Sequence, residues 1–303
     1  MHKIIRPFLA LLLGASLFSQ PVLAQQADLG PTLNKIAESG NIYLAVREAA
    51  IPFSYVLEDK KTPAGYSWDI CQRVAKAVEE KLGKPITIVP VIASTSGRMM
   101  MVKVGMADIE CGSTTNTVGR QRQVAFSNTL FVSEIRIMVR ANSGIKDAAD
   151  LKDKKVVTTS GTSGERLVRQ LAMQRNLPIR QMQGRSNFES MRMLERGEVD
   201  AFVSDDALLL EQRANSENPQ AYVLLPRAMT SVEPYGLVIR NDDPEFKKLV
   251  DAVLVQLFKS GEIEKVYDKW FNQAIPKVTH PLNMPLSDLN KAAFANPNDK
   301  AGN

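Results

Sequence analysis

Hydroxyl side chains and one arginine gather in the stretch ECGSTTNTVGR, which ends at Arg120. Ser113, Thr114 and Thr115 can each donate and accept a hydrogen bond, and Gly112 allows a ligand to approach the backbone closely. Arg120 adds a planar guanidinium group, which fits a carboxylate through two parallel hydrogen bonds. The stretch therefore predicts a site for a carboxylate, and the alternative is a surface turn with an exposed arginine.

Two further segments carry polar groups next to predicted helices. TTSGTSGE (158–165) places hydroxyls and glycines before a helix, whose free N–H groups attract anions, although serine and threonine also cap many helices without binding a ligand. VSDDALL (203–209) places two acids, one of them Asp205, between a buried strand and a helix. One acid can cap the helix while the other pairs with an ammonium group, and capping alone is the alternative.

Arg47 and Arg98 each follow a predicted strand. A single arginine in such a position is usually a solvated surface group. Two of them, together with the carboxylate-binding stretch, predict a second anionic group on the same ligand.

Residues suited to catalysis are scarce. Apart from His2 the chain has one histidine, His280, in a proline-flanked tail. No cysteine or histidine spacing is typical of a metal site. Binding is therefore favoured over catalysis, and neither a metal nor a cofactor is expected.

The elements that must position these groups alternate along the chain. The hydrophobic pattern predicts strands and helices in turn, at 42–46, 67–82, 86–92, 98–104 and 107–111. This strand–helix order predicts an α/β fold with mostly parallel sheets flanked by helices. In such sheets the ligand binds beyond the carboxyl ends of the strands, where the polar groups above are found.

A short internal repeat predicts a second lobe of the same kind. MVKVGMADIE (101–110) and MLERGEVDAF (193–202) share Met, Gly and Asp at identical offsets, and the second copy also lies between a helix and a strand. A chance match is the alternative. A strand at 235–239 and a helix at 244–260 return the chain to the first lobe, so the boundary is crossed twice, as in a hinge.

The N-terminus predicts export. A basic start, an apolar run over 8–18 and the small-residue end Val22-Leu23-Ala24 form a secretory signal peptide (1–24), cut after about Ala24. Export permits a disulfide bond, and the patterns around Cys71 and Cys111 turn both side chains inward. A bridge between them is expected, with two buried free thiols as the alternative.

The formal net charge is +5, and basic and acidic residues are mixed along the chain. The sequence has no run of lysines or arginines that would contact successive phosphates of a nucleic acid, so nucleic acid is not expected as a partner.

Taken together, these segments resemble the periplasmic solute-binding proteins of polar amino-acid ABC transporters (solute-binding family 3), and within them the glutamate/aspartate-binding branch. GYSWDI, LKDKKVVTTSGTSGE and YGLVIRNDDPEFKKLV carry the family resemblance, and REAAIPFSY, ECGSTTN and NPNDKA carry that to the branch. The resemblance implies a two-lobed periplasmic binding protein fold of type II with two crossover hinge strands. Lobe 1 would comprise 25–133 and 236–303, and lobe 2 would comprise 134–235.

The resemblance also implies roles for individual residues. Those that would hold the ligand's amino-acid end are Ser113, Thr115, Arg120, Thr159, Thr162 and Asp205, the last facing the α-ammonium group. Those that would hold its side-chain carboxylate are Arg47, Thr95 and Arg98. Asn187 stands where the branch carries a histidine near the ligand side chain.

The implied function is periplasmic binding of L-glutamate or L-aspartate by lobe closure, followed by delivery to an ABC permease. A monomer is expected. Because an asparagine can both donate and accept hydrogen bonds, glutamine, asparagine or a related polar amino acid is an alternative ligand. A sensor subunit, or an enzyme like some periplasmic dehydratases, is an alternative role on the same fold.

Overall fold

The computed structural model describes His2 and residues 29–174, 177–229 and 232–302. The predicted signal peptide therefore lies outside the described residues, apart from His2. Within the described ranges, no helix has the length and apolar character needed to span a bilayer.

Lobe 1 is built on a five-stranded sheet. Its strands, in spatial order, are β5 (Thr87–Ala93), β1 (Asn41–Arg47), β6 (Ile109–Glu110), β15 (Val238–Ile239) and β7 (Ala125–Phe126). The helices of this lobe are α1 (Gly30–Ser39), α2 (Tyr66–Leu82), α3 (Arg98–Lys103), α4 (Val118–Gln121), α8 (Pro244–Lys259), α9 (Glu262–Phe271) and α10 (Asp288–Ala295). A small sheet beside it contains β2 (Ala49–Ala50), β3 (Ser54–Val56) and β4 (Pro63–Ala64).

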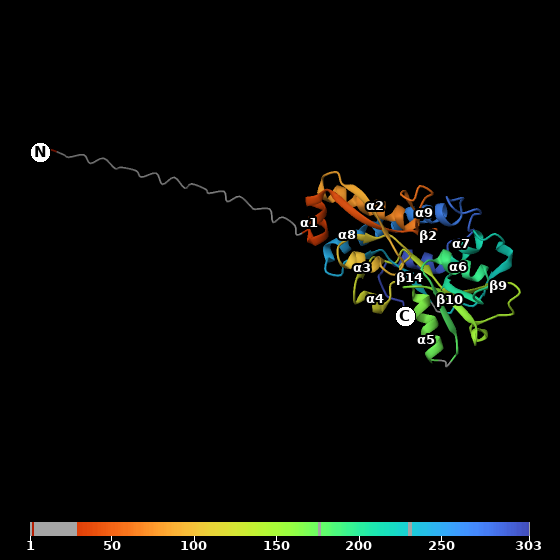
Figure 1. Ribbon diagram of the computed structural model, residues 1–303. Coiled ribbons are helices and arrows are strands. Elements are labelled where there is room, and N and C mark those ends of the chain that lie inside the picture. Colours follow the sequence, from red (N-terminus) through yellow and green to blue (C-terminus); the bar gives the residue numbers. More distant parts are fainter. Residues whose placement is uncertain (1, 3–28, 175–176, 230–231, 303) are drawn as a thin grey trace.

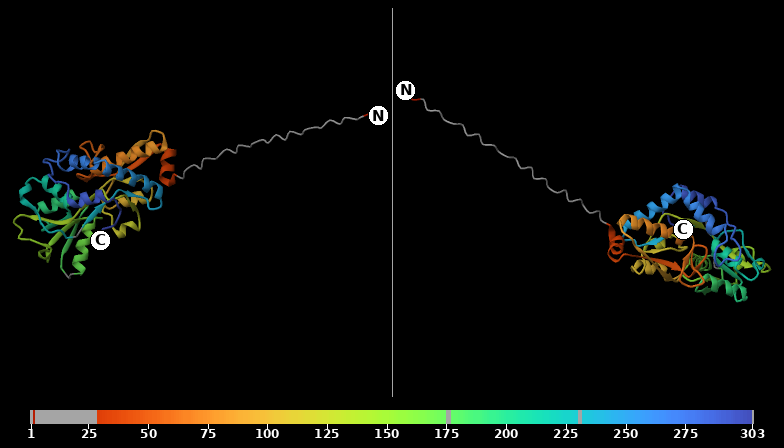
Figure 2. Two further views of the ribbon diagram at one scale, coloured as in Figure 1. Left: turned by 180° about the vertical axis from the view of Figure 1, so that it is seen from behind. Right: turned by 90° about the horizontal axis from the view of Figure 1, so that it is seen from above.

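Lobe 2 repeats the plan with fewer helices. Its strands, in spatial order, are β11 (Arg180–Gly184), β10 (Lys155–Thr159), β12 (Ala201–Asp205), β9 (Ile135–Arg140) and β13 (Tyr222–Leu224). Its helices are α5 (Ser163–Gln174), α6 (Asn187–Glu195) and α7 (Asp206–Ala214), with 3₁₀ turns η1 (Ala148–Leu151) and η2 (Pro219–Ala221). The two lobes lie side by side in Figures 1 and 2, with lobe 2 in green to cyan. The predicted two-lobed α/β fold is confirmed.

The expectation of mostly parallel sheets is wrong in detail. β1 pairs in parallel with β5 and β6, and β10 pairs in parallel with β11 and β12. β15 and β9, however, pair only with antiparallel neighbours. These two strands enter their sheets from the connection between the lobes, not through a strand–helix–strand crossover, so the sequence order of helices does not set their direction.

Two strands connect the lobes. β8 (Phe131–Ser133) and β14 (Glu233–Tyr235) pair antiparallel. The lobe boundaries predicted after residues 133 and 235 follow the last residue of each strand. The single strand predicted over 235–239 is wrong, because the backbone N–H groups of Gly236 and Leu237 donate to the Thr114 carbonyl (3.2 Å) and to the Ser127 hydroxyl (2.9 Å) instead of to a sheet.

The internal repeat is reproduced at the level of atoms. The Asp108 carboxylate accepts a hydrogen bond from the Tyr43 N–H (2.8 Å), and the Asp108 N–H donates to the Tyr43 carbonyl (2.7 Å). In lobe 2 the Asp200 carboxylate accepts from the Lys155 N–H (2.9 Å), and the Asp200 N–H donates to the Lys155 carbonyl (2.8 Å). In both lobes this aspartate joins the start of one strand to its parallel neighbour.

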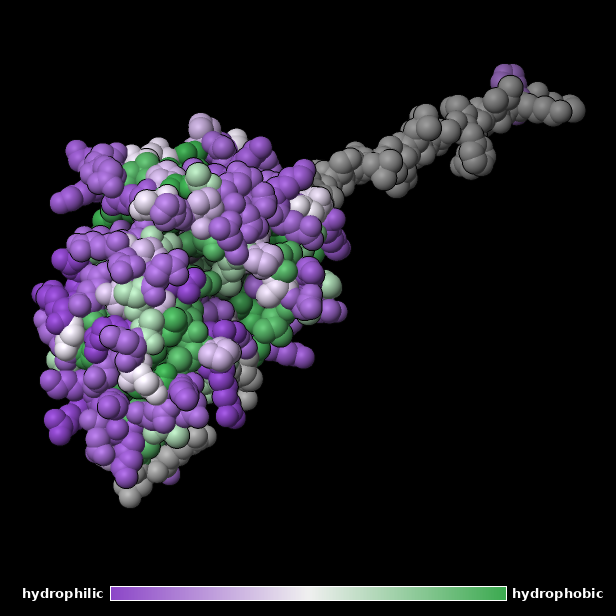
Figure 3. Space-filling model, turned by 90° about the vertical axis from the view of Figure 1, so that its right-hand side faces the viewer, coloured by the Kyte–Doolittle hydropathy of each residue, from purple (hydrophilic) through white to green (hydrophobic). Residues whose placement is uncertain are grey.

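The core of lobe 1 is rich in aromatic side chains and contains the disulfide bond. Phe53, Phe131 and Phe271 pack together with ring centroids 4.8–5.4 Å apart. Cys71 of α2 is bonded to Cys111, directly after β6, and closes a 40-residue separation. Figure 3 shows one face of the molecule, where hydrophilic side chains cover most of the surface and hydrophobic ones gather in its middle.

Candidate functional site

A small cavity lies between the two lobes. The residues that line it are Arg47, Thr95, Arg98, Ser113, Thr115, Arg120, Thr162, Ser163, Asn187, Asp205 and Leu208. Nine of the ten residues predicted to contact the ligand are in this set. Thr159 is not.

Hydrogen bonds to residues outside the loop fix the position of the segment after β6. The Ser67 hydroxyl donates to the Gly112 carbonyl (2.8 Å), and the Asn116 amide donates to the Asp299 carbonyl in the C-terminal tail (2.8 Å). The expected role of Gly112 needs correction. A Cβ there would lie 1.9 Å from the Glu110 carboxylate and 3.2 Å from Cγ of Arg47, so the glycine makes room for these side chains.

Arg120 joins this loop to lobe 2. It lies in α4, which begins after Thr117, whose hydroxyl accepts from the Arg120 N–H. Its Nη1 donates to the Thr115 carbonyl (2.8 Å), and its Nη2 donates to the Gly161 carbonyl (3.0 Å) across the interlobe boundary. Burial, together with the neighbouring charge of Arg98, lowers the pKa of Arg120 to about 9.

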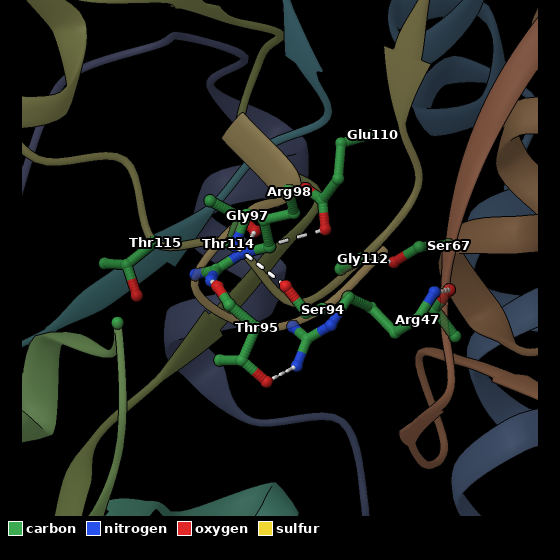
Figure 4. A network of polar contacts seen from close by, with 12 residues as sticks. Arg47, Ser67, Ser94, Thr95, Gly97, Arg98, Glu110, Gly112, Thr114 and Thr115 are labelled. Atoms are coloured by element: carbon green, nitrogen blue, oxygen red, sulfur yellow. Dashed lines mark hydrogen bonds and ion pairs between the residues drawn. The ribbon is translucent and has the colours of Figure 1, made fainter. Parts of the chain in front are cut away.

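Arg47 and Arg98 meet at Thr95 (Figure 4). Arg47 ends β1, and its Nη2 donates to the Thr95 hydroxyl. Arg98 begins α3. Its Nε donates to the Thr114 hydroxyl (2.6 Å) and its Nη1 donates to the Thr95 carbonyl. Burial, with the charge of Arg98 beside it, lowers the pKa of Arg47 to about 9, and burial also lowers the pKa of Arg98.

Asp205 supplies a negative group to the cavity. It is the last residue of β12, and its carboxylate accepts from the Tyr235 hydroxyl of crossover strand β14 (2.5 Å). Burial raises the pKa of Asp205 to about 7, and the nearby carboxyl of Glu233 acts in the same direction. Leu208, one turn into α7, provides an apolar wall beside it.

In lobe 2, Thr159 positions Asn187. The hydroxyl of Thr159 is fully buried; it donates to Oδ1 of Asn187 (2.7 Å) and lies 3.1 Å from the Ser190 hydroxyl. Asn187 also lines the cavity, and its N–H groups can donate hydrogen bonds to a ligand. The hydroxyl of Thr162 bonds to the Thr159 carbonyl (2.6 Å), which shapes the turn before α5.

Two cavity residues were not predicted. Ser163 begins α5, and its hydroxyl lies 3.4 Å from that of Thr115 in the other lobe. It belongs to the TTSGTSGE segment, so the signal was present, but capping and binding serines look alike in sequence. Leu208 had no signal, because an apolar residue in the first turn of a helix is read as core.

The lobes are in contact around the cavity. Besides the bonds from Arg120 and Thr115, a Cβ at Gly161 would lie only 2.8 Å from Cα of Ser96 in lobe 1. At the far end of α7, the Asn215 amide donates to the Lys277 carbonyl (2.8 Å). The arrangement is therefore a closed one, with a small polar cavity enclosed between the lobes.

The chain is similar to proteins of known class. Residues 42–273 match the model for bacterial extracellular solute-binding proteins, family 3. A glutamate/aspartate import solute-binding protein of Escherichia coli K12 is 43% identical over 100% of this chain and 99% of its own. An L-glutamate/L-aspartate-binding protein of Pseudomonas aeruginosa PAO1 is 41% identical over 95% of this chain and 94% of its own. A crystal structure of a mutant of ArgBP from T. maritima has a TM-score of 0.71 at 25% identity, covering 80% of this chain and 100% of its own.

Proposed function

The chain belongs to family 3 of the bacterial extracellular solute-binding proteins, and from this premise we propose that it captures L-glutamate or L-aspartate between its lobes. The captured amino acid is then delivered to an ABC permease for uptake. The observation that carries the proposal is the set of three buried guanidinium groups that line one interlobe cavity. Buried cations are unfavourable without anionic partners, and an acidic amino acid supplies two carboxylates.

The assignment of each group follows its position. Arg120, with Ser113 and Thr115, takes the α-carboxylate, and Asp205 takes the α-ammonium group. Arg47 and Arg98 take the side-chain carboxylate. Charge-assisted hydrogen bonds of this kind are roughly twice as strong as neutral ones.

The position of Asn187 favours an acidic ligand over an amide. Its carbonyl oxygen already accepts one hydrogen bond from Thr159, and we infer that its N–H groups are the ones turned to the ligand. A donor matches a carboxylate oxygen, as a protonated histidine would. A glutamine side chain would place its own N–H groups among donors and leave some of them unpaired.

The proposed setting is the periplasm, reached through the signal peptide cut after about Ala24, and the proposed form is a monomer. The relatives above are solute-binding proteins, which supports binding without turnover.

Variants of the arginines test this division of roles by calorimetric titration with L-glutamate and L-glutamine. Arg120→Met should weaken both ligands by about a hundredfold or more, because both carry an α-carboxylate. Arg98→Met should penalise glutamate far more than glutamine, since only glutamate has a second carboxylate. Equal losses for both ligands in Arg98→Met would refute the division.

A further inference from the structure

A buried acid lies behind the two arginines assigned to the ligand side chain. Glu110 is the last residue of β6 and has no solvent exposure. Figure 4 shows its carboxylate directed toward Arg98, with Gly112 and Arg47 close by. It does not line the cavity, and although it opens the stretch ECGSTTNTVGR, the sequence pattern gave it no role.

The surroundings of Glu110 are unusual for a carboxylate. Neither of its oxygens has a hydrogen-bond partner among the described residues. Its nearest ionic partner is Nε of Arg98, at 3.8 Å, which is too long for a hydrogen bond. A buried carboxylate without hydrogen bonds is unfavourable, so the charges of neighbouring guanidinium groups must stabilise it.

Glu110 does not orient these guanidinium groups. Arg98 is held by the Thr114 hydroxyl and the Thr95 carbonyl, and Arg47 is held by the Thr95 hydroxyl. These acceptors are neutral. The contribution of Glu110 to this end of the cavity is therefore its charge, and Gly112 leaves the space that its carboxylate occupies.

The charges at this end sum to a single positive one, because two guanidinium groups face one carboxylate. We propose that Glu110 is a specificity-determining residue, which sets the net charge at the side-chain end of the cavity to match a ligand with one carboxylate there. The inference rests on the proposed function and adds to it a residue that never touches the ligand.

The first test is titration of the wild-type protein and Glu110→Gln with L-glutamate and L-glutamine. The variant leaves two unopposed positive charges at this end, so its attraction for an anionic side chain should increase. The ratio of glutamate to glutamine affinity should rise about tenfold. An unchanged ratio, or a fall in it, would overturn the inference, the latter by indicating that Glu110 positions Arg98.

A second test avoids the uncompensated charge, which could prevent Glu110→Gln from folding. In the variant Arg98→Gln, the charges of Arg47 and Glu110 cancel each other, and the preference for glutamate should be lost. The double variant Arg98→Gln, Glu110→Gln restores one net positive charge, and its affinity ratio should recover several-fold relative to the single variant. A double variant no more selective than Arg98→Gln would contradict the inference.

The two tests separate this inference from the proposed function. If the wild-type protein prefers glutamate and the Glu110 variants do not change the ratio as stated, only the role of Glu110 fails. If the wild-type protein binds neither amino acid, the proposed function fails, and the inference fails with it.

Discussion

The guanidinium groups of the cavity are held by neutral oxygens. Arg47 donates to a threonine hydroxyl, Arg98 to a hydroxyl and a carbonyl, and Arg120 to two carbonyls. Such acceptors fix the direction of each group without cancelling its charge. The positive charge therefore remains available to an anionic ligand, and the buried acid Glu110 beside Arg98 reduces it.

The pKa of Asp205 makes ligand affinity depend on pH. This group has a raised pKa of about 7, and it must be ionised to pair with an ammonium group. Affinity for glutamate should therefore fall about tenfold between about pH 8 and about pH 6. Titrations across this range test the point, and binding at about pH 7 should release protons. An affinity that stays constant over the range would exclude Asp205 from the ammonium site.

The stability of the empty protein should change in the opposite direction. The pKa of Asp205 in the folded chain lies above its ordinary value of 3.8, so the folded state holds the proton more tightly than the unfolded state. This contribution is present at low pH and is lost as the pH rises through about 7. The melting temperature of the ligand-free protein should therefore rise slightly between about pH 8 and about pH 6.

Sequence reasoning at the residue scale found the polar residues that line the cavity and missed two buried acids, Glu110 and Glu233. Hydroxyls, glycines and arginines after strands are visible as clusters, and these led to the cavity. Glu110 ends one short strand and Glu233 begins another, and the sequence does not show which cation lies near either acid. Burial raises the pKa of Glu233, and the hydroxyls of Ser163 and Thr115 act in the opposite direction. No signal from spacing could have placed it there.

At the scale of elements, several helices begin at the cavity. Arg98 is the first residue of α3, Ser163 of α5 and Asn187 of α6. The unpaired N–H groups and positive end of a helix favour anions, which reinforces the arginines. Each of these helices follows a strand of a parallel pair, so the order of elements alone predicted where they meet.

The remaining elements depended on contacts that are distant in sequence. The antiparallel strands β9 and β15 were not foreseen as such, because their direction is set by the return of the chain between lobes. The proline-rich tail gave no sign in the sequence of a contact with the rest of the molecule. In the structure, Asn290 of α10 bonds to both backbone groups of Val132 in β8 (2.8 and 3.2 Å), and the Gly302 N–H donates to the Asn116 carbonyl. The tail thus supports a crossover strand and the binding loop together.

The turn before α5 provides a test of interlobe contact. Gly161 has a φ of +79°, and a Cβ there would lie 2.8 Å from Cα of Ser96, whereas Gly197 has a φ of +72° and open space around it. Ala at either position should cost about 1 kcal/mol of folding stability, since L-residues disfavour this conformation. Only Gly161→Ala should also weaken glutamate binding, by about tenfold or more, because its Cβ obstructs closure.

Gly197→Ala is the matched control in this comparison. Urea unfolding gives the stability of each variant, and calorimetry gives the affinity. Equal effects of the two substitutions on binding would mean that the contact between Gly161 and Ser96 is not needed for closure.

For the whole molecule, ligand and closure are linked. Enclosing three guanidinium groups without an anion is unfavourable, so the empty protein should favour separated lobes. A ligand can shift this balance only by its greater affinity for the closed state. The crossover strands β8 and β14 are the two connections about which the lobes would move. Closure around the correct ligand then gives the permease a shape to recognise.

The most direct test of the central claim is calorimetric titration of the wild-type protein with L-glutamate and L-glutamine under identical conditions. These ligands differ only in whether the side chain ends in a carboxylate or an amide. If positive groups at both ends of the cavity select a molecule with two carboxylates, glutamate should bind about a hundredfold more tightly. Glutamine binding as tightly as glutamate would contradict the account.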